Sequence, residues 1–190
     1  MIILHIFTEE LSAKIVFDEV LPKLIPGVHY RIYPHQGKGD LYKALETTVP
    51  SISKIPGSRI LITRDQDNYD CKDVKADLLK LVDGKCACPH SIRIVCRELE
   101  SWFLGDLNAI KQAYPRFKPE QHSAKADFRN VDSIAIPNDY LLRIIPEYQG
   151  MATLPKLETS SKISKFLDLE NNTSKSFKFT LSAITQLVAN

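Results

Sequence analysis

Short apolar runs alternate with amphipathic segments over residues 1–115 of the chain. A short apolar run between turn-forming residues is typical of a buried strand, whereas apolar positions three or four residues apart are typical of a helix that faces a core. Proline and glycine separate these units, as at Pro26 and Gly27. The pattern therefore predicts four strands, each followed by a helical segment, at residues 2–7, 28–33, 59–63 and 91–96.

The alternation of strand and helix predicts the fold class. Repeated units of this kind form right-handed crossovers and a mostly parallel sheet that helices cover on both faces. Beyond Pro115 the signal weakens, and residues 157–189 are typical of two helices joined by the polar stretch ENNTSKS. We expect an α/β domain over residues 1–150, with a basic helical element at residues 151–190 that packs on the same domain.

Composition narrows the class of protein further. A chain of 190 residues that is 44% hydrophobic can bury a core of its own. Its 25 basic and 23 acidic residues give a net charge of +2, so any nucleic-acid binding must come from a local patch. No apolar run could span a bilayer, and the opening residues become acidic too early for a signal peptide. We expect a cytoplasmic protein that does not bind membranes, and the composition is compatible with a homo-oligomer.

Acidic residues follow three of the four predicted strands: Glu9, Asp65, Asp67, Glu98 and Glu100. Each alone is also explained by a helix start or a surface loop. The carboxyl ends of parallel strands meet at one edge, and residues two apart in extended backbone face the same side, so each pair is expected to project together. Clustered carboxylates repel one another unless a cation neutralises them, and oxygen donors suit Mg²⁺ or Mn²⁺ rather than zinc. The occurrence of all these acids at one edge of the sheet favours a metal site.

Two further groups allow more than one interpretation. The loop from His35 to Asp40 could hold a phosphate through its backbone and Lys38, but it lacks the P-loop spacing and is equally typical of a tight turn. His35 could also be structural. The four cysteines occupy one short stretch, and the Cys-x-Cys spacing favours incidental thiols over a zinc site. These cysteines are Cys71, Cys86, Cys88 and Cys96.

The aromatic pair Trp102 and Phe103 is expected to anchor the core rather than to stack on nucleic-acid bases. The pair lies in the string Glu98-Leu99-Glu100-Ser101-Trp102-Phe103. This string, with Phe7-Thr8-Glu9-Glu10, His35-Gln36-Gly37-Lys38, Asp65-Gln66-Asp67 and the tail 172–177, resembles the mostly bacterial family known as domain of unknown function 4276, placed among the TOPRIM-like domains. The resemblance covers nearly the whole chain, with Thr8 and Ser160 as departures from the family pattern.

The resemblance implies roles for particular residues. TOPRIM domains hold Mg²⁺ for strand cleavage or transfer with one Glu after the first strand and an Asp-x-Asp after the third, which match Glu9, Asp65 and Asp67 here. The resemblance also places a lysine at Lys156, which we expect to supply the positive charge opposite the metal. We add Glu100 as a metal ligand and Glu98 as a further acidic group of the active site. The residues expected to bind substrate are His35, Gln36, Lys38, Ser174 and Ser176.

The leading hypothesis is a Mg²⁺-dependent, TOPRIM-type nuclease or nucleotidyl-transfer subunit that acts on phosphodiester bonds of nucleic acid. The resemblance also implies an ABC-type or SMC-like ATPase partner and a role in antiphage defence. Two alternatives stay open. One is a non-catalytic subunit of an ATPase complex that binds a metal or a partner through its acidic edge, and the other is a small-molecule phosphohydrolase that acts on nucleotides.

Overall fold

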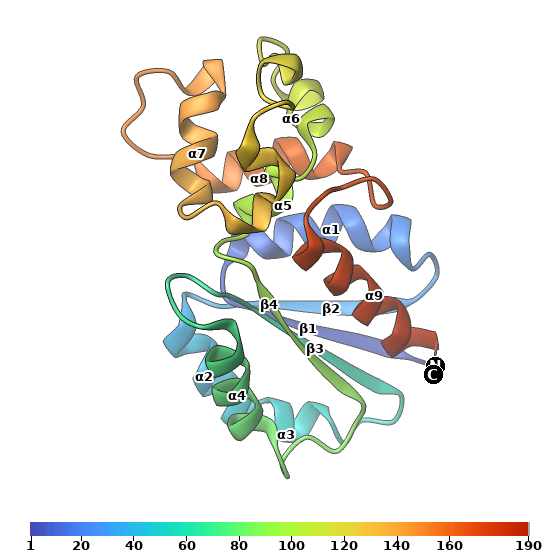
Figure 1. Ribbon diagram of the computed structural model, residues 1–190. Coiled ribbons are helices and arrows are strands. Elements are labelled where there is room, and N and C mark those ends of the chain that lie inside the picture. The colour runs from blue at the N-terminus through green and yellow to red at the C-terminus, as the bar shows by residue number, and fades with distance from the viewer. Residues whose placement is uncertain (190) are drawn as a thin grey trace.

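A four-stranded parallel sheet lies at the centre of the protein, with the strand order β2-β1-β3-β4 (Figure 1). The computed structural model describes residues 1–189. Neighbouring strands pair in parallel throughout, and Thr8 of β1 aligns with Thr63 of β3. The predicted α/β class, a parallel sheet flanked by helices, is therefore confirmed. The strands are β1 (Ile3–Thr8), β2 (His29–Pro34), β3 (Ser58–Asp65) and β4 (His90–Val95).

Helices cover both faces of the sheet, which explains the continuous apolar runs of the central strands. On one face α1 (Leu11–Leu24) and α9 (Lys175–Ala189) pack over Leu4 and Ile6 of β1 and Leu61 of β3. On the other face three shorter helices pack over the side chains that point the opposite way (Figure 1). Strands buried on both sides lose the polar alternation of a half-exposed strand. The three helices are α2 (Lys38–Thr47), α3 (Val49–Ile52) and α4 (Cys71–Val82).

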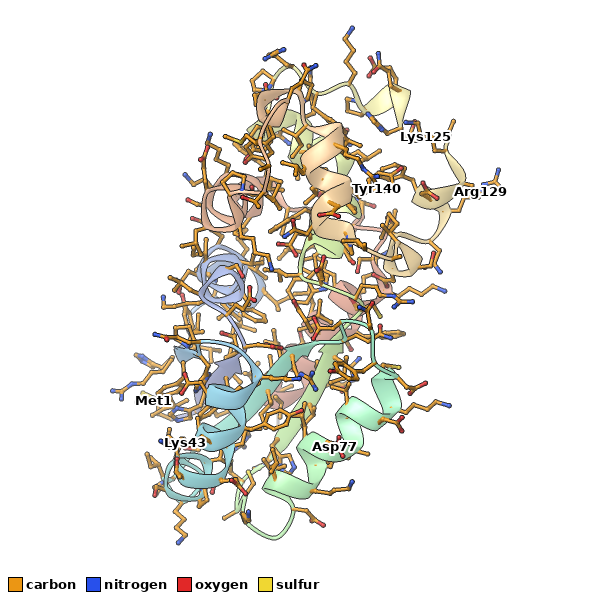
Figure 2. The ribbon with its side chains drawn as sticks, turned by 90° about the vertical axis from the view of Figure 1, so that its left-hand side faces the viewer. Met1, Lys43, Asp77, Lys125, Arg129 and Tyr140 are labelled. Carbon is orange, nitrogen blue, oxygen red and sulfur yellow. The ribbon has the colours of Figure 1, made fainter. Side chains whose placement is uncertain are left out.

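A second tier of helices lies beyond α1 and away from the sheet. Figure 2 shows this tier, to which Lys125 and Tyr140 belong, in the upper part of the view. Asp77, beside α4, is labelled in the lower part, where the sheet lies. Helix α8 packs directly on α1. The second tier consists of α5 (Glu100–Leu104), α6 (Leu107–Ala113), α7 (Pro137–Ile144) and α8 (Lys156–Ile163), with short 3-10 turns η1 (Pro119–Gln121), η2 (Ala126–Arg129), η3 (Val131–Ser133), η4 (Pro146–Tyr148) and η5 (Ser164–Phe166).

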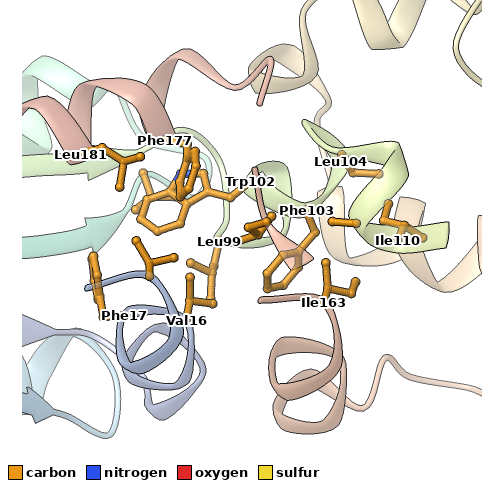
Figure 3. Close-up of a cluster of buried hydrophobic side chains, with 14 of the residues drawn as sticks. Val16, Phe17, Leu99, Trp102, Phe103, Leu104, Ile110, Ile163, Phe177 and Leu181 are labelled. Atoms are coloured by element: carbon orange, nitrogen blue, oxygen red, sulfur yellow. The ribbon is translucent and has the colours of Figure 1, made fainter. Parts of the chain in front are cut away.

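Trp102 joins the two tiers. Its ring lies 5.9 Å from Phe17 of α1 and 5.2 Å from Phe177 of α9, centroid to centroid (Figure 3). Its indole nitrogen donates a hydrogen bond to Ser176 Oγ at 3.0 Å, so the buried polar atom is satisfied. Trp102 and Phe103 are 1% and 0% exposed, which confirms them as core residues. Because α5 begins at Glu100, this anchor also fixes the start of that helix.

The C-terminal segment shares this core. Leu154, Ile163 and Phe177 belong to the same buried cluster as Leu4 of the sheet. The two helices expected over residues 157–189 are present as α8 and α9. The first five residues of the stretch ENNTSKS lie in the connection between them, and its last two begin α9. The boundary at residue 150 stays a prediction. Among residues 1–189, no helix is both long enough and apolar enough to cross a membrane.

Gly105 gives a test of how tightly the segment before α9 is held against α5. The Asn172 side chain donates to the Trp102 carbonyl at 2.8 Å, and a Cβ at Gly105 would collide with the Asn172 side-chain oxygen and lie 2.9 Å from Ser174 N. We expect Gly105→Ala to reduce the free energy of unfolding by roughly 2–3 kcal/mol through overpacking. Denaturant unfolding measures this change.

Gly39 provides the matched control, because a Cβ there meets no atom within 4 Å and the residue lies in α2. Gly39→Ala should leave stability unchanged or raise it by about 0.5–1 kcal/mol, as alanine favours helices. Equal effects of the two substitutions would contradict the packing described for Gly105.

Candidate active site at the carboxyl edge of the sheet

The carboxyl ends of all four strands lie at one edge, and backbone hydrogen bonds join the loops that leave them. His35 N donates to Thr8 O at 3.0 Å, which ties the loop after β2 to the end of β1. Asp67 N donates to Arg97 O at 2.8 Å and ties the loop after β3 to the loop after β4. The side chains that follow the strands are therefore held in one place.

Asp65 and Glu100 form the centre of the acidic site. Asp65 is half-buried, and its Oδ2 atom accepts a hydrogen bond from Leu99 N at 3.4 Å. Asp65 N in turn donates to Glu9 Oε2 at 3.3 Å. Glu100 is only 1% exposed, and its Oε2 atom has no hydrogen-bond partner among the described residues. An unpaired buried carboxylate oxygen is costly unless a proton or a cation neutralises it.

The pKa values of three acids reflect this crowding. Burial raises the pKa of Asp65 well above its usual value, and the neighbouring carboxylates Glu100, Glu9 and Glu10 raise it further. Burial also raises the pKa of Glu100 to about 7, although the nearby Lys156 ammonium opposes the shift. The pKa of Glu9 is raised by burial against the opposing charge of an arginine. A site with several raised acids is a functional candidate.

Lys156 reaches this site from the first position of α8. Its Nζ atom lies 3.4 Å from Glu10 Oε2, across 146 positions of the chain. Burial opposes the charged form, but Glu100, Glu10 and Asp65 outweigh it and raise the pKa of Lys156. The approach of Lys156 to the acidic cluster agrees with the position that the family resemblance gave it.

Arg64 is a site residue that the sequence analysis did not identify. It is 4% exposed, and its guanidinium lies 3.6 Å from Glu9 Oε2 and 3.7 Å from Asp67 Oδ2. The same group donates to Tyr42 Oη at 2.7 Å and lies over the Tyr69 ring. A buried charge needs partners of this kind. The available signal was an arginine at the end of an otherwise apolar strand.

The pairing of acids by strand alternation was wrong in detail. The strand β3 ends at Asp65, and Asp67 adopts a left-handed backbone with φ of 55°, so its carboxylate faces Arg64. Glu100 begins α5 rather than continuing an extended segment, and Glu98 Oε2 accepts a hydrogen bond from Asn138 N at 2.9 Å. Glu98 still contributes to the electric field at Glu100 and at Lys156.

The loop after β2 has structural roles at two of its three candidate positions. The His35 ring makes a hydrogen bond to Thr8 O at 2.8 Å and stacks on Phe7. Gln36 N donates to Asp40 Oδ2 at 3.1 Å, which leaves its exposed side chain outside this turn. Lys38 is exposed, with Nζ 3.5 Å from the Tyr69 hydroxyl. Lys38 is thus the residue of this loop whose charge is available to a substrate.

Ser174 and Ser176 are buried, which corrects their expected role in substrate binding. Ser174 Oγ accepts from Phe177 N at 3.1 Å, so it caps α9, and it donates to Asp132 Oδ1 at 2.7 Å. Ser176 N donates to Asp132 Oδ2 at 3.0 Å. The two serines therefore hold the start of α9 against the second tier instead of facing a substrate.

The donor atoms of the acidic cluster suit a hard cation. Glu9, Asp65 and Glu100 supply only oxygen ligands, and the unpaired Oε2 of Glu100 is an available ligand atom. Within residues 1–189, no three His, Cys, Asp or Glu side chains are already arranged at metal-binding distances. The chemistry of the residues thus fits Mg²⁺ or Mn²⁺, and the side chains would have to close around the ion.

Comparison with known proteins adds a fold relationship. No family model and no curated protein match the chain, so the resemblance to domain of unknown function 4276 stays a prediction. The solved structure of the C-terminal region of the OLD protein from Xanthomonas campestris pv. campestris is similar to this fold, with a TM-score of 0.50 and 16% sequence identity. The similarity covers 98% of this chain and 95% of that one, and it concerns the fold.

The raised pKa of Glu100 predicts how stability depends on pH without divalent metal. Between its usual value of 4.5 and about 7 the folded state holds a proton that the unfolded state has lost. The free energy of unfolding should therefore fall as pH rises through this window, by about 3 kcal/mol at most. Thermal unfolding in a chelating buffer measures the change. Glu100→Gln should reduce the slope, with a remainder from Asp65 and Glu9, whose pKa values are also raised, and the exposed Glu158→Gln should leave it unchanged. An unchanged slope in Glu100→Gln would contradict the assignment.

Proposed function

We propose that the protein is a metal-dependent phosphodiester hydrolase that acts on nucleic acid. The observation that carries the proposal is the convergence of Glu9, Asp65 and Glu100 beside Lys156, with a buried carboxylate oxygen left unpaired. Such a set of acids is stable only with a counter-charge, and a phosphate-bound cation supplies one. Open α/β sheets bind ligands beyond the carboxyl ends of their strands, and the acids lie at that edge of a fold similar to the OLD C-terminal region.

Each residue has a role in this proposal. Asp65, Glu100 and Glu9 would hold the cation, which when bound polarises a phosphoryl oxygen and lowers the pKa of water. Lys156 faces the negative charge that develops on the phosphate oxygens. Arg64 holds the Glu9 carboxylate through its contact of 3.6 Å and keeps it turned toward Asp65 N. Lys38 stands at the rim as a contact for a neighbouring phosphate.

The hollow at the acidic edge is too small to enclose a metabolite. It lies between Glu9, Glu10 and Asp65, whereas a cavity of about 630 Å³ lies elsewhere, against α6 and the segment before α9. A small ligand is normally bound where most of its surface is buried. A phosphodiester backbone can instead pass over the surface of this edge and present one phosphate at a time.

Cleavage assays test the proposal directly. The purified chain should cut single- or double-stranded DNA or RNA in Mg²⁺ or Mn²⁺ and lose this activity with a chelator. Turnover of free nucleotides without cleavage of polymers would replace the proposal with a phosphohydrolase. The wider proposal includes an ATPase partner and a role in antiphage defence, so the cleavage assay is repeated with such a partner present. Absence of cleavage both with and without the partner would overturn the proposed hydrolase activity.

Asp65→Asn should separate catalysis from stability. The amide removes a ligand and a negative charge, so cleavage should fall by roughly 100-fold or more. The melting temperature in a chelating buffer should stay equal or rise, because the repulsion that raises the pKa of Asp65 disappears. Asp77→Asn is the matched control, since Asp77 is exposed on the outer side of α4 (Figure 2). Full cleavage by Asp65→Asn would exclude Asp65 as a metal ligand.

Lys156→Ala tests the positive charge opposite the acids. We expect turnover to drop by roughly 10- to 100-fold, while the free energy of unfolding changes by less than about 1 kcal/mol. Lys162→Ala serves as the control on the same helix, because Lys162 is exposed and pairs with Glu158. Steady-state cleavage rates and denaturant unfolding measure the two effects. Equal rates for both variants would leave α8 with a packing role only.

A further inference from the structure

A pair of cysteines and a histidine lie together between α4 and β4, outside the acidic site. Cys86 and Cys88 are half-buried, and their Sγ atoms are 3.9 Å apart. Cys86 N donates to Val82 O at 2.9 Å and closes the end of α4, while His90 is the first residue of β4. All four cysteines of the chain are free thiols. The two sulfur atoms are therefore close, in contact and unbonded.

The two thiols are chemically unequal. Burial opposes ionisation of Cys86, but interactions with His90 and with Cys88 together outweigh it and lower the pKa of Cys86. Burial raises the pKa of Cys88 to about 12, and the charge of Cys86 contributes to this increase. The contribution of Cys86 disappears once its sulfur is covalently bonded. Cys86 thus has the character of an attacking thiolate, and Cys88 that of a thiol that reacts second.

We propose that Cys86 and Cys88 are a reversible thiol–disulfide site that exchanges with small-molecule disulfides such as glutathione disulfide. The Cys86 thiolate attacks one sulfur of glutathione disulfide and releases one glutathione thiolate. Cys88 then loses its proton to solvent, its sulfur attacks Cys86 Sγ, and the second glutathione thiolate leaves. Two protein thiols lose two electrons in this reaction, and one small-molecule disulfide becomes two thiols.

The geometry favours a disulfide over a metal site. The sulfur atoms must approach from 3.9 Å to about 2.05 Å, which side-chain rotation in a surface loop can provide. Within the described residues, Cys86, Cys88 and His90 are not placed together around a common metal position. A disulfide across only one intervening residue is strained, and strained disulfides are the ones that reduce readily. The bond would therefore form and break with the surrounding thiol pool.

The location makes this site independent of the proposed hydrolase. His90 begins β4, whereas Glu98 and Glu100 follow its other end. Pro89 O accepts a hydrogen bond from Ile60 N at 3.0 Å, so the loop is attached to the amino-terminal half of the sheet. The length of the sheet separates the cysteines from the carboxylates. Failure of nucleic-acid cleavage would leave the thiol chemistry unaffected, and the reverse also holds.

Peptide mapping of the full chain provides the test. The reduced protein is incubated with glutathione disulfide and a chelator, the remaining free thiols are alkylated, and the chain is cut with trypsin. Lys85 and Arg93 bound one peptide that contains both cysteines. We expect this peptide to lose two hydrogens and to resist alkylation, and a reductant should restore both thiols.

Variants identify the order of attack. Cys88→Ser should retain glutathione on Cys86, and Cys86→Ser should slow the reaction of Cys88 by roughly tenfold or more. Cys71→Ser is the control, because Cys71 is exposed and lies outside the pair. The proposal is overturned if residues 86–93 stay fully alkylated while Cys71 reacts, or if the disulfide joins Cys71 to Cys96. Peptide mapping of the wild-type chain is enough to decide whether the Cys86–Cys88 disulfide forms, even if the variants do not fold.

Discussion

Repulsion among enclosed carboxylates is the constraint on which the rest of the site depends. Burial raises the energy of the charged forms of Asp65 and Glu100, and neighbouring carboxylates add to that cost, Glu100 at Asp65 and Glu98 at Glu100. Neither would stay in place in a loose structure, because a charged side chain turns toward water when it can. The parallel sheet prevents this by fixing the strand ends, and Lys156 offsets part of the charge. The acidic site thus stores unfavourable energy that the hydrophobic core must balance.

The elements that hold the site also connect its two sides. Helix α1 begins just after Glu10, and α8, which carries Lys156, packs on α1. Helix α5 carries Glu100 at its first position, and Trp102 anchors it between α1 and α9 (Figure 3). The second tier is therefore what brings Lys156 to the strand ends. A mutation that loosens Trp102 would move Glu100 and Lys156 together.

The sequence predicted the parts of the site that depend on period and topology. The strands were recognised by their apolar runs, and parallel pairing then placed Asp65 beside Leu99 and Glu9. The sequence did not predict the direction of the Asp67 side chain, because Asp67 itself adopts a left-handed backbone that interrupts the alternation. Ser174 and Ser176 were misassigned because helix capping and substrate binding use the same residue type. Arg64 was missed since its partners, Glu9, Asp67 and Tyr42, meet it only in the folded chain.

The fold alone does not determine the chemistry, because a parallel sheet flanked by helices can support different sites. The chemistry of the acidic site depends on how the negative charge of Glu100 is neutralised. A proton does so below a pH of about 7, and Lys156 contributes a fixed positive charge nearby. In the proposed function, a divalent cation would compete with that proton for the same carboxylate, so its affinity would increase as pH rises through neutrality. The unpaired oxygen of Glu100 links protonation to folding stability, and in that proposal it would link both to metal binding.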